Sequence, residues 1–145
     1  MTFYTQDNYH PANSVGFVLH KAHKRLVADM DAALKGLNVK SQHVGILISL
    51  LRRSQARSTT LSRQLGVNPG LMSRMLDSLE ALGLLMRSRD RQDRRAVNVR
   101  LTDVGRATAR RIRELTPEVL NARLHGFTEA EFVELRRLLY KLIEK

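Results

Sequence analysis

The sequence contains no cysteine among its 145 residues. Disulfides, thiolate metal sites and a cysteine-based redox sensor are therefore excluded. Tryptophan is also absent, and aromatic residues make up only 5% of the chain. No apolar run approaches the ~20 residues that a membrane-spanning helix needs, and the first residues lack the basic start and apolar stretch of a secretory signal. These absences lead us to expect a cytoplasmic protein without a membrane partner.

The motifs of common catalytic sites are missing as well. The chain has neither a G-x-S-x-G nucleophile motif nor a G-x-x-x-x-G-K phosphate loop. His20 and His23 lie three residues apart, as two metal ligands on one helix face would, but a zinc site gathers three or four ligands. We therefore expect no enzymatic activity, no metal and no resident cofactor.

Arginine is concentrated in the middle of the chain. The formal net charge is +11, and the segment from Arg52 to Arg113 holds 15 arginines, no lysine and five acidic residues. The two flanks together carry 10 basic and nine acidic residues. Basic side chains bind phosphates by releasing condensed counterions, so a nucleic acid partner is favoured. The alternative is a solvated basic surface, but the exclusive use of arginine in one segment favours the first interpretation.

Apolar residues recur three and four positions apart in four long segments. This spacing predicts a helix over 13–37 with Asn13 or Ser14 as N-cap, and one over 42–53 with Ser41 as N-cap. A third helix is predicted over 103–124, with Thr102 as N-cap and a kink at Pro117. A last helix starts at a capping box formed by Thr128 and Glu131.

The arginine-rich segment contains two further helices and a hairpin. Residues 60–65 predict a short helix, and Asn68 and Pro69 open a longer one that extends to residue 82. Two helices joined by a tight turn make a helix-turn-helix. Residues 84–89 and 95–101 predict two strands around a charged turn. The fold class is therefore mainly α with a small β-hairpin (α+β).

The segment GVNPGLMSRMLDSLEALGLLMRSRDRQDRRAVNVRLTDVGRA resembles the winged helix-turn-helix of the MarR (multiple antibiotic resistance regulator) family. The wing sequence DRQDRR leading into LTDVG is the most specific part, followed by SRMLDSLEALG. The resemblance implies a single domain over 1–145. Within it we expect a DNA-binding lobe over 41–101 and dimerisation helices over 1–37 and 103–145. It also implies a homodimer that regulates transcription at a palindromic operator.

The recognition helix, residues 69–82, should enter the major groove with its N-terminal end first. Arg74 is placed to make a bidentate contact to guanine, and Gly70 permits close approach of the backbone. The predicted DNA contacts from the two helices are Ser62, Arg63, Gln64, Pro69, Gly70, Leu71, Ser73 and Arg74.

The wing, residues 87–97, should lie over the adjacent minor groove, where either Arg94 or Arg95 inserts. Arg89 and Arg91 are expected to contact phosphates. As the family's wing aspartate does, Asp93 should pair with a wing arginine and fix its orientation.

Family members often bind small phenolic or other aromatic anions between the dimerisation region and the winged helix, which weakens DNA binding. The resemblance therefore implies a repressor released by such an effector, although the chain leaves open whether it represses or activates. The candidate effector contacts are His20, Lys24, His43 and Arg87. The alternative for each is a solvated or internally satisfied side chain.

Two other functions compete with a sequence-specific regulator of double-stranded DNA. One is a sequence-nonspecific architectural or RNA-binding basic protein, and the other is a helical interaction module with an incidental basic face. The hairpin and the short helix before Asn68 disfavour the module. RNA binders stack bases on exposed aromatic side chains, and none lies between Arg52 and Arg113. A regulator should prefer its operator over random duplex by at least ~10³.

Overall fold

The computed structural model describes residues 1–144, so Lys145, the end of the predicted C-terminal range, lies outside the described residues. Six α-helices and a three-stranded sheet form the described chain. The helices are α1 (Val15–Leu34), α2 (Ser41–Arg52), α3 (Ser58–Leu65), α4 (Pro69–Ala81), α5 (Asp103–Arg123) and α6 (Glu129–Ile143). The strands are β1 (Ala56–Arg57), β2 (Leu85–Arg89) and β3 (Val97–Leu101), and short 3-10 turns cover Pro11–Asn13 and Lys35–Leu37.

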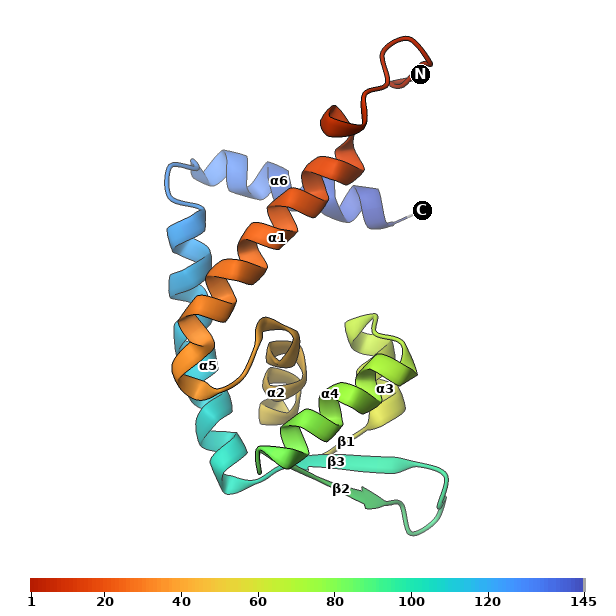
Figure 1. Ribbon diagram of the computed structural model, residues 1–145, viewed down its shortest axis with the longest axis vertical. Coiled ribbons are helices and arrows are strands. Elements are labelled where there is room, and N and C mark those ends of the chain that lie inside the picture. Colours follow the sequence, from red (N-terminus) through yellow and green to blue (C-terminus); the bar gives the residue numbers. More distant parts are fainter. Residues whose placement is uncertain (145) are drawn as a thin grey trace.

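The chain divides into a compact lobe and an extended arm (Figure 1). The lobe contains α2, α3, α4 and the sheet, whereas α1, α6 and the upper part of α5 form the arm. The long helix α5 begins at the sheet and runs up into the arm, so it joins the two parts. The fold class is thus the predicted one, a winged helix-turn-helix flanked by long helices.

The sheet is antiparallel with the order β1-β3-β2. Strands β2 and β3 form the predicted hairpin, with Arg87 opposite Val99. The first strand was not predicted, because two residues are too few to display the alternation that identifies a strand. Ala56 of β1 is buried against β3, opposite Val99.

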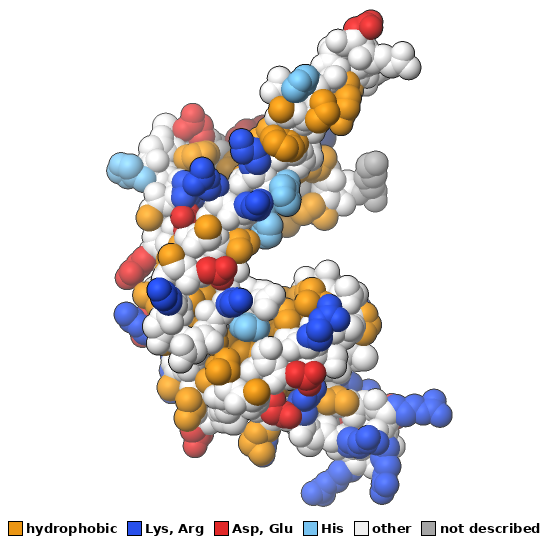
Figure 2. Space-filling view, viewed as in Figure 1, with side chains coloured by type: hydrophobic (Ala, Val, Ile, Leu, Met, Phe, Trp, Pro, Cys, Tyr) orange, Lys and Arg blue, Asp and Glu red, His pale blue; other side chains and the backbone are white. Residues whose placement is uncertain are grey.

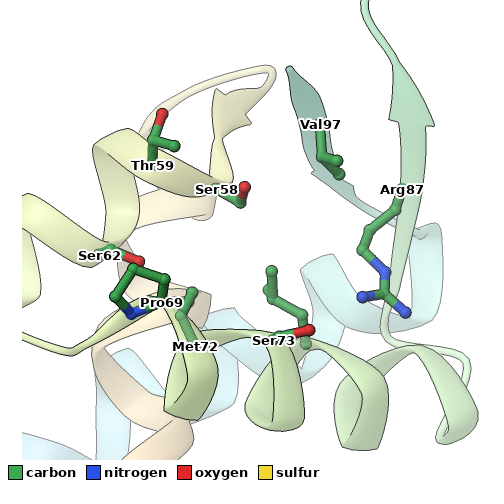
Figure 3. Close-up of a pocket in the computed structure, with 9 residues that line it drawn as sticks. Ser58, Thr59, Ser62, Pro69, Met72, Ser73, Arg87 and Val97 are labelled. Atoms are coloured by element: carbon green, nitrogen blue, oxygen red, sulfur yellow. The ribbon is translucent and has the colours of Figure 1, made fainter. Parts of the chain in front are cut away.

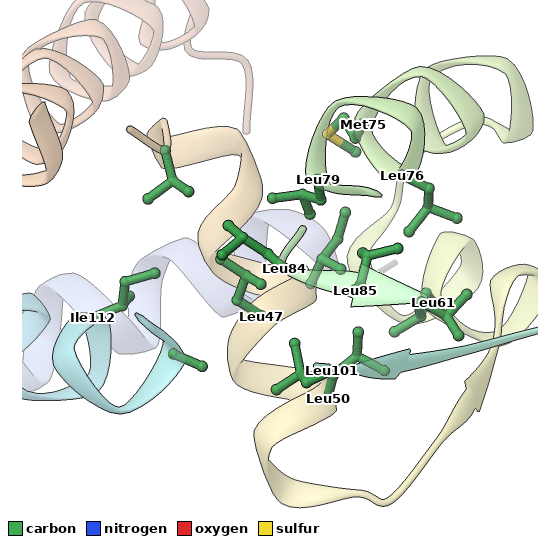
Figure 4. Packing of buried hydrophobic residues seen from close by; sticks show 14 of the residues in the cluster. Leu47, Leu50, Leu61, Met75, Leu76, Leu79, Leu84, Leu85, Leu101 and Ile112 are labelled. Atoms are coloured by element: carbon green, nitrogen blue, oxygen red, sulfur yellow. The ribbon is translucent and has the colours of Figure 1, made fainter. Parts of the chain in front are cut away.

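The core fills the space between α2, α3, α4, the sheet and the first half of α5 (Figure 4). Its fully buried side chains include Leu47, Leu50, Leu61, Leu76, Leu79, Leu85, Val99 and Ile112. Met72 and Met75 are also buried, as their spacing on the recognition helix indicates. Burial of the apolar face of α4 leaves its polar face directed outward.

Most helix starts follow the predicted caps. The side chains of Ser14, Asn68, Thr102 and Thr128 each accept a hydrogen bond from a backbone N–H in the first turn of their helix. The last of these belongs to the predicted capping box. The first long helix is shorter than predicted, because residues 35–37 adopt a 3-10 turn that ends at Asn38 in the left-handed conformation.

The predicted N-cap of α2 is wrong. Ser41 is the first helical residue, and its N–H donates to the Asp31 carboxylate at 2.6 Å. The preceding N–H, that of Lys40, donates instead to Nδ1 of His43 at 3.1 Å. The other ring nitrogen of His43, Nε2, is buried without a partner among the described residues.

The arm contains an ion pair between its two long helices, α1 and α5, and offers much apolar surface. Arg123 of α5 donates to the Asp29 carboxylate of α1 at 2.6 and 2.8 Å. Large exposed apolar side chains lie on the N-terminal segment, α1 and α6, and include Phe3, Tyr4, Val18, Phe127, Phe132, Leu138 and Ile143.

The lobe and α5 meet at a corner built around Leu84. The Leu84 carbonyl accepts a hydrogen bond from the Thr102 N–H at 3.1 Å, and the Thr102 hydroxyl donates to the Gly83 carbonyl at 2.6 Å. A methyl group on Gly105 would lie 1.7 Å from the Leu84 carbonyl oxygen. The close approach of α5 to this corner therefore requires glycine at position 105.

We predict that Gly105→Ala lowers the free energy of unfolding by about 3 kcal/mol or more, because backbone atoms must move apart to admit the methyl group. Chemical denaturation at fixed protein concentration measures the loss. Gly16→Ala is the matched control, since nothing lies near its added methyl group, and alanine favours a helix over glycine. Equal stability of the two variants would contradict the tight corner.

We also predict a loss of stability in mild acid that depends on His43. Burial, followed by the nearby Lys40, lowers the pKa of His43 below its ordinary value of 6.5, against the opposing effect of Asp31. The unfolded chain then binds a proton that the folded chain does not, so the free energy of unfolding falls as the pH drops below 6.5. His43→Gln, which keeps an acceptor for the Lys40 N–H, should flatten this dependence in denaturation curves from pH 7.5 to 5. The exposed His20→Gln should not, and identical curves for wild type and His43→Gln would contradict the assignment.

Candidate nucleic-acid interface

Helix α4 presents a polar N-terminal end to solvent. Asn68 accepts a hydrogen bond from the Leu71 N–H at 2.8 Å, which fixes the start of the helix. Of the predicted contacts on α4, Pro69, Gly70, Ser73 and Arg74 are exposed and Leu71 is half-buried. This exposed helix N-terminus offers backbone N–H groups, and the Arg74 side chain adds a positive charge. Both suit contact with a polyanion.

Helix α3 lies next to α4 across a tight turn. Gly66 has a φ of 64°, and the Val67 N–H donates to the Ser62 carbonyl at 3.0 Å to close the turn. Arg63 and Gln64 are exposed, whereas Ser62 is half-buried. A shallow surface hollow is lined by Ser62, Arg63 and Pro69 together, so the structure brings predicted contacts of both helices to one face.

A second hollow, of about 110 Å³, lies between α3, α4 and the first wing strand. Figure 3 shows Ser62, Ser73 and Arg87 around it, one from each of these three elements. Predicted residues that lie far apart in the sequence are therefore neighbours. The helix-turn-helix and the wing form one continuous surface.

The wing carries its arginines outward. Arg89, Arg91, Arg94 and Arg95 are all exposed, and Figure 2 shows lysine and arginine side chains projecting from the wing tip at the lower right. The loop is closed at its base by the Asp90 N–H, which donates to the Ala96 carbonyl at 3.0 Å. The wing therefore holds four guanidinium groups on a short hairpin end that is closed by its own hydrogen bonds.

The residue that organises this loop is Asp90, which was not singled out from the sequence. Its carboxylate accepts hydrogen bonds from the N–H groups of Gln92 and Asp93 and from the Asn98 amide, at 2.8, 3.1 and 3.2 Å. These bonds and the nearby Arg57 lower the pKa of Asp90, so it stays charged. Aspartate often starts a turn by accepting a hydrogen bond from the N–H two residues ahead, so the position of Asp90 at the start of the charged turn could have indicated this role.

Asp93 acts differently from the prediction. Its carboxylate accepts a hydrogen bond from the backbone N–H of Arg95 at 3.1 Å. No ion pair joins Asp93 to an arginine side chain within residues 1–144. The aspartate therefore shapes the backbone at Arg95, and the guanidinium groups of Arg94 and Arg95 remain in solvent.

The four candidate effector contacts are not brought together. His20 and Lys24 are exposed on α1 in the arm, whereas Arg87 belongs to β2 in the lobe. His43 is buried at the start of α2. Arg87 is already paired with Asp77 and Glu80 of α4, through nitrogen–oxygen distances of 2.5 and 3.2 Å.

A different cavity lies where α2 and α3 meet α5. It has a volume of about 400 Å³ and is mostly apolar, with walls from Val44, Ile48, Leu65 and Pro117. Arg113 and the hydroxyl-bearing Thr116 also line it. The sequence gives no sign that Arg113 lines a cavity, because its position opposite α2 depends on how α5 packs and not on the local sequence.

The described chain offers neither a membrane-spanning helix nor a metal-binding cluster. No helix within residues 1–144 is long and apolar enough to cross a membrane. The same residues contain no cluster of three or more metal-ligating side chains.

Comparisons with known proteins agree with this geometry. The model of the MarR family matches residues 40–97. The HTH-type transcriptional regulator PecS of Dickeya dadantii is 33% identical over 113 residues, which cover 76% of this chain and 68% of PecS. A mutant MarR from Escherichia coli in complex with operator DNA has a TM-score of 0.82 and 25% identity, over 88% of this chain and 92% of that chain.

BpsR of Bordetella bronchiseptica, solved in a study of how 6-hydroxynicotinic acid regulates its DNA binding, gives a TM-score of 0.83 at 25% identity. This match covers 94% of this chain and 98% of BpsR. The chain therefore belongs to the MarR family, and its winged helix-turn-helix is the DNA-binding module of a transcriptional regulator.

Proposed function

We propose that the chain is a homodimeric repressor that binds a palindromic operator and is released by a small aromatic anion. The single observation that carries the DNA-binding part is the surface on which the exposed N-terminal end of α4 adjoins a wing with four outward arginines. That combination offers one element for the major groove and one for the adjacent minor groove.

The recognition helix α4 would read bases through Arg74, and Ser73 would contact a base or a phosphate. Ser62, Arg63 and Gln64 of α3 would fix the register on the backbone, together with Arg89 and Arg91 of the wing. Pro69, Gly70 and Leu71 would lie closest to the groove floor or a phosphate. Arg95 is the better placed of the two candidates for the minor groove, because the hydrogen bond from its N–H to Asp93 fixes the backbone there.

The proposed dimerisation region, residues 1–37 and 103–145, includes the arm. The proposed DNA-binding lobe covers residues 41–101. Exposed Phe, Leu and Ile side chains of α6 and exposed Phe3 and Tyr4 would be costly in water unless a second subunit covers them. A two-fold dimer would present two α4 helices to two half-sites about one helical turn apart.

The α2–α5 cavity is the proposed effector site, in place of the four residues chosen from the sequence. Its volume falls within the range of small-molecule sites, and its apolar walls suit an aromatic ring. Arg113 would pair with a carboxylate or phenolate on that ring. Because the cavity is bounded by α5, which links arm and lobe, an occupant would change the angle between them.

The test of DNA recognition is a titration of the wild-type protein against a random-sequence duplex pool, with recovery of the bound sequences. A palindromic consensus, bound by two chains at least ~10³ tighter than random duplex, is expected. Arg74→Ala should relax the preference at one position in each half-site, whereas Arg95→Ala should weaken binding with the melting temperature unchanged. Equal binding to all duplexes would indicate an architectural protein, and preference for single-stranded RNA would overturn the proposal.

The effector site is tested with benzoate and 6-hydroxynicotinic acid as probes. We expect at least one of them to raise the melting temperature of the wild type and to weaken operator binding. Arg113→Gln should abolish both effects, because the cavity then lacks its cation. Arg111→Gln is the control, since Arg111 pairs with Glu114 on the surface of the same helix. A response that survives Arg113→Gln would place the effector elsewhere.

A further inference from the structure

The recognition helix carries more acid than base. Within Pro69–Ala81 the only basic residue is Arg74, whereas Asp77 and Glu80 are both acidic and exposed. A helix of net negative charge is repelled by the phosphate backbone that it must approach. DNA binding by α4 therefore requires that these two carboxylates be neutralised from elsewhere in the lobe.

Arg87 of β2 supplies the missing charge. Its Nη2 donates to Asp77 Oδ1 at 2.5 Å and to Glu80 Oε1 at 3.3 Å, and its Nε donates to Glu80 Oε2 at 3.2 Å. The backbone N–H of Arg87 donates to the same Glu80 oxygen at 3.1 Å. One residue of the wing strand thus makes four hydrogen bonds to two side chains one turn apart on the recognition helix.

The environment of Arg87 differs from that of the other wing arginines. Its side chain is only 25% exposed, and Figure 3 shows it pointing from β2 toward α4 beside the hollow. The hydrogen bonds from Arg87 lower the pKa of Glu80, so the carboxylate keeps its charge and the pair stays intact at neutral pH. Two of the three guanidinium nitrogens of Arg87, Nε and Nη2, donate to carboxylates.

We propose that Arg87 is a positioning residue for operator recognition, which neutralises Asp77 and Glu80 and holds the first wing strand against the recognition helix. Arg87 acts on DNA through those two carboxylates and makes no phosphate contact of its own. This inference rests on the proposed DNA binding by α4 and the wing. It assigns Arg87 a role distinct from the effector contact expected from the sequence.

A double-mutant cycle tests the proposal on an operator duplex selected by the wild-type protein. Arg87→Gln should weaken operator binding roughly tenfold in the wild-type background, since groups that act as a unit couple strongly. In an Asp77→Asn/Glu80→Gln background the same change should cost less than about twofold, because no carboxylate remains to be neutralised. Arg87→Lys should recover part of the loss, since an ammonium keeps the charge but cannot reproduce the guanidinium fork.

Arg89→Gln is the matched control on the same strand. As a phosphate contact it should cost the same in both backgrounds and lower the salt slope of binding by about one. Melting curves separate binding from folding, since a partly exposed ion pair adds little stability and Arg87→Gln should melt close to wild type. An equal cost of Arg87→Gln in both backgrounds, with the salt slope lowered, would make Arg87 a direct phosphate contact and overturn the proposal. Failure of the wild type to select any sequence would instead contradict the proposed function.

Discussion

The corner at Gly83 and Leu84 sets how the recognition helix, the wing and α5 lie relative to one another. The recognition helix ends there, the first wing strand begins there, and the last wing strand returns to it before α5 starts. The Leu84 carbonyl is held by the Thr102 N–H and covered by Gly105, so four elements share one small contact. Because α5 also extends into the arm, it connects the arm to the DNA-binding lobe at the same point.

Charge in the lobe is divided between two tasks. Arginines at the wing tip lie in solvent, where a phosphate can replace water at little cost. Arg87 and Arg57 instead pair with carboxylates of the lobe, with Arg57 beside Asp90 at the base of the wing and Arg87 beside α4. Asp77, Glu80 and Asp90 therefore belong to the scaffold that shapes the surface.

The α2–α5 cavity lies further along α5 than this corner. An occupant would act on α5 through Arg113 and Thr116, about two to three turns along the helix from Gly105. A ligand shifts an equilibrium only by as much as its affinities for the two states differ. In the proposed dimer, a small rotation of α5 would change the spacing of the two lobes, and a ligand that binds one spacing more tightly would then weaken binding to an operator with a fixed distance between its half-sites.

The sequence by itself determined the order of the elements, the helix caps at Asn68, Thr102 and Thr128, the burial of Met72 and Met75, and the basic surface. Each of these follows from residue type and short-range spacing, which the chain carries locally. Only the tertiary structure decided the pairing of Arg87 with Asp77 and Glu80, the strand at Ala56, the bond from the Ser41 N–H to Asp31 and the cavity beside Arg113. Each of these depends on which distant residues the packing brings within a few ångströms, and no periodicity along the chain encodes such a distance.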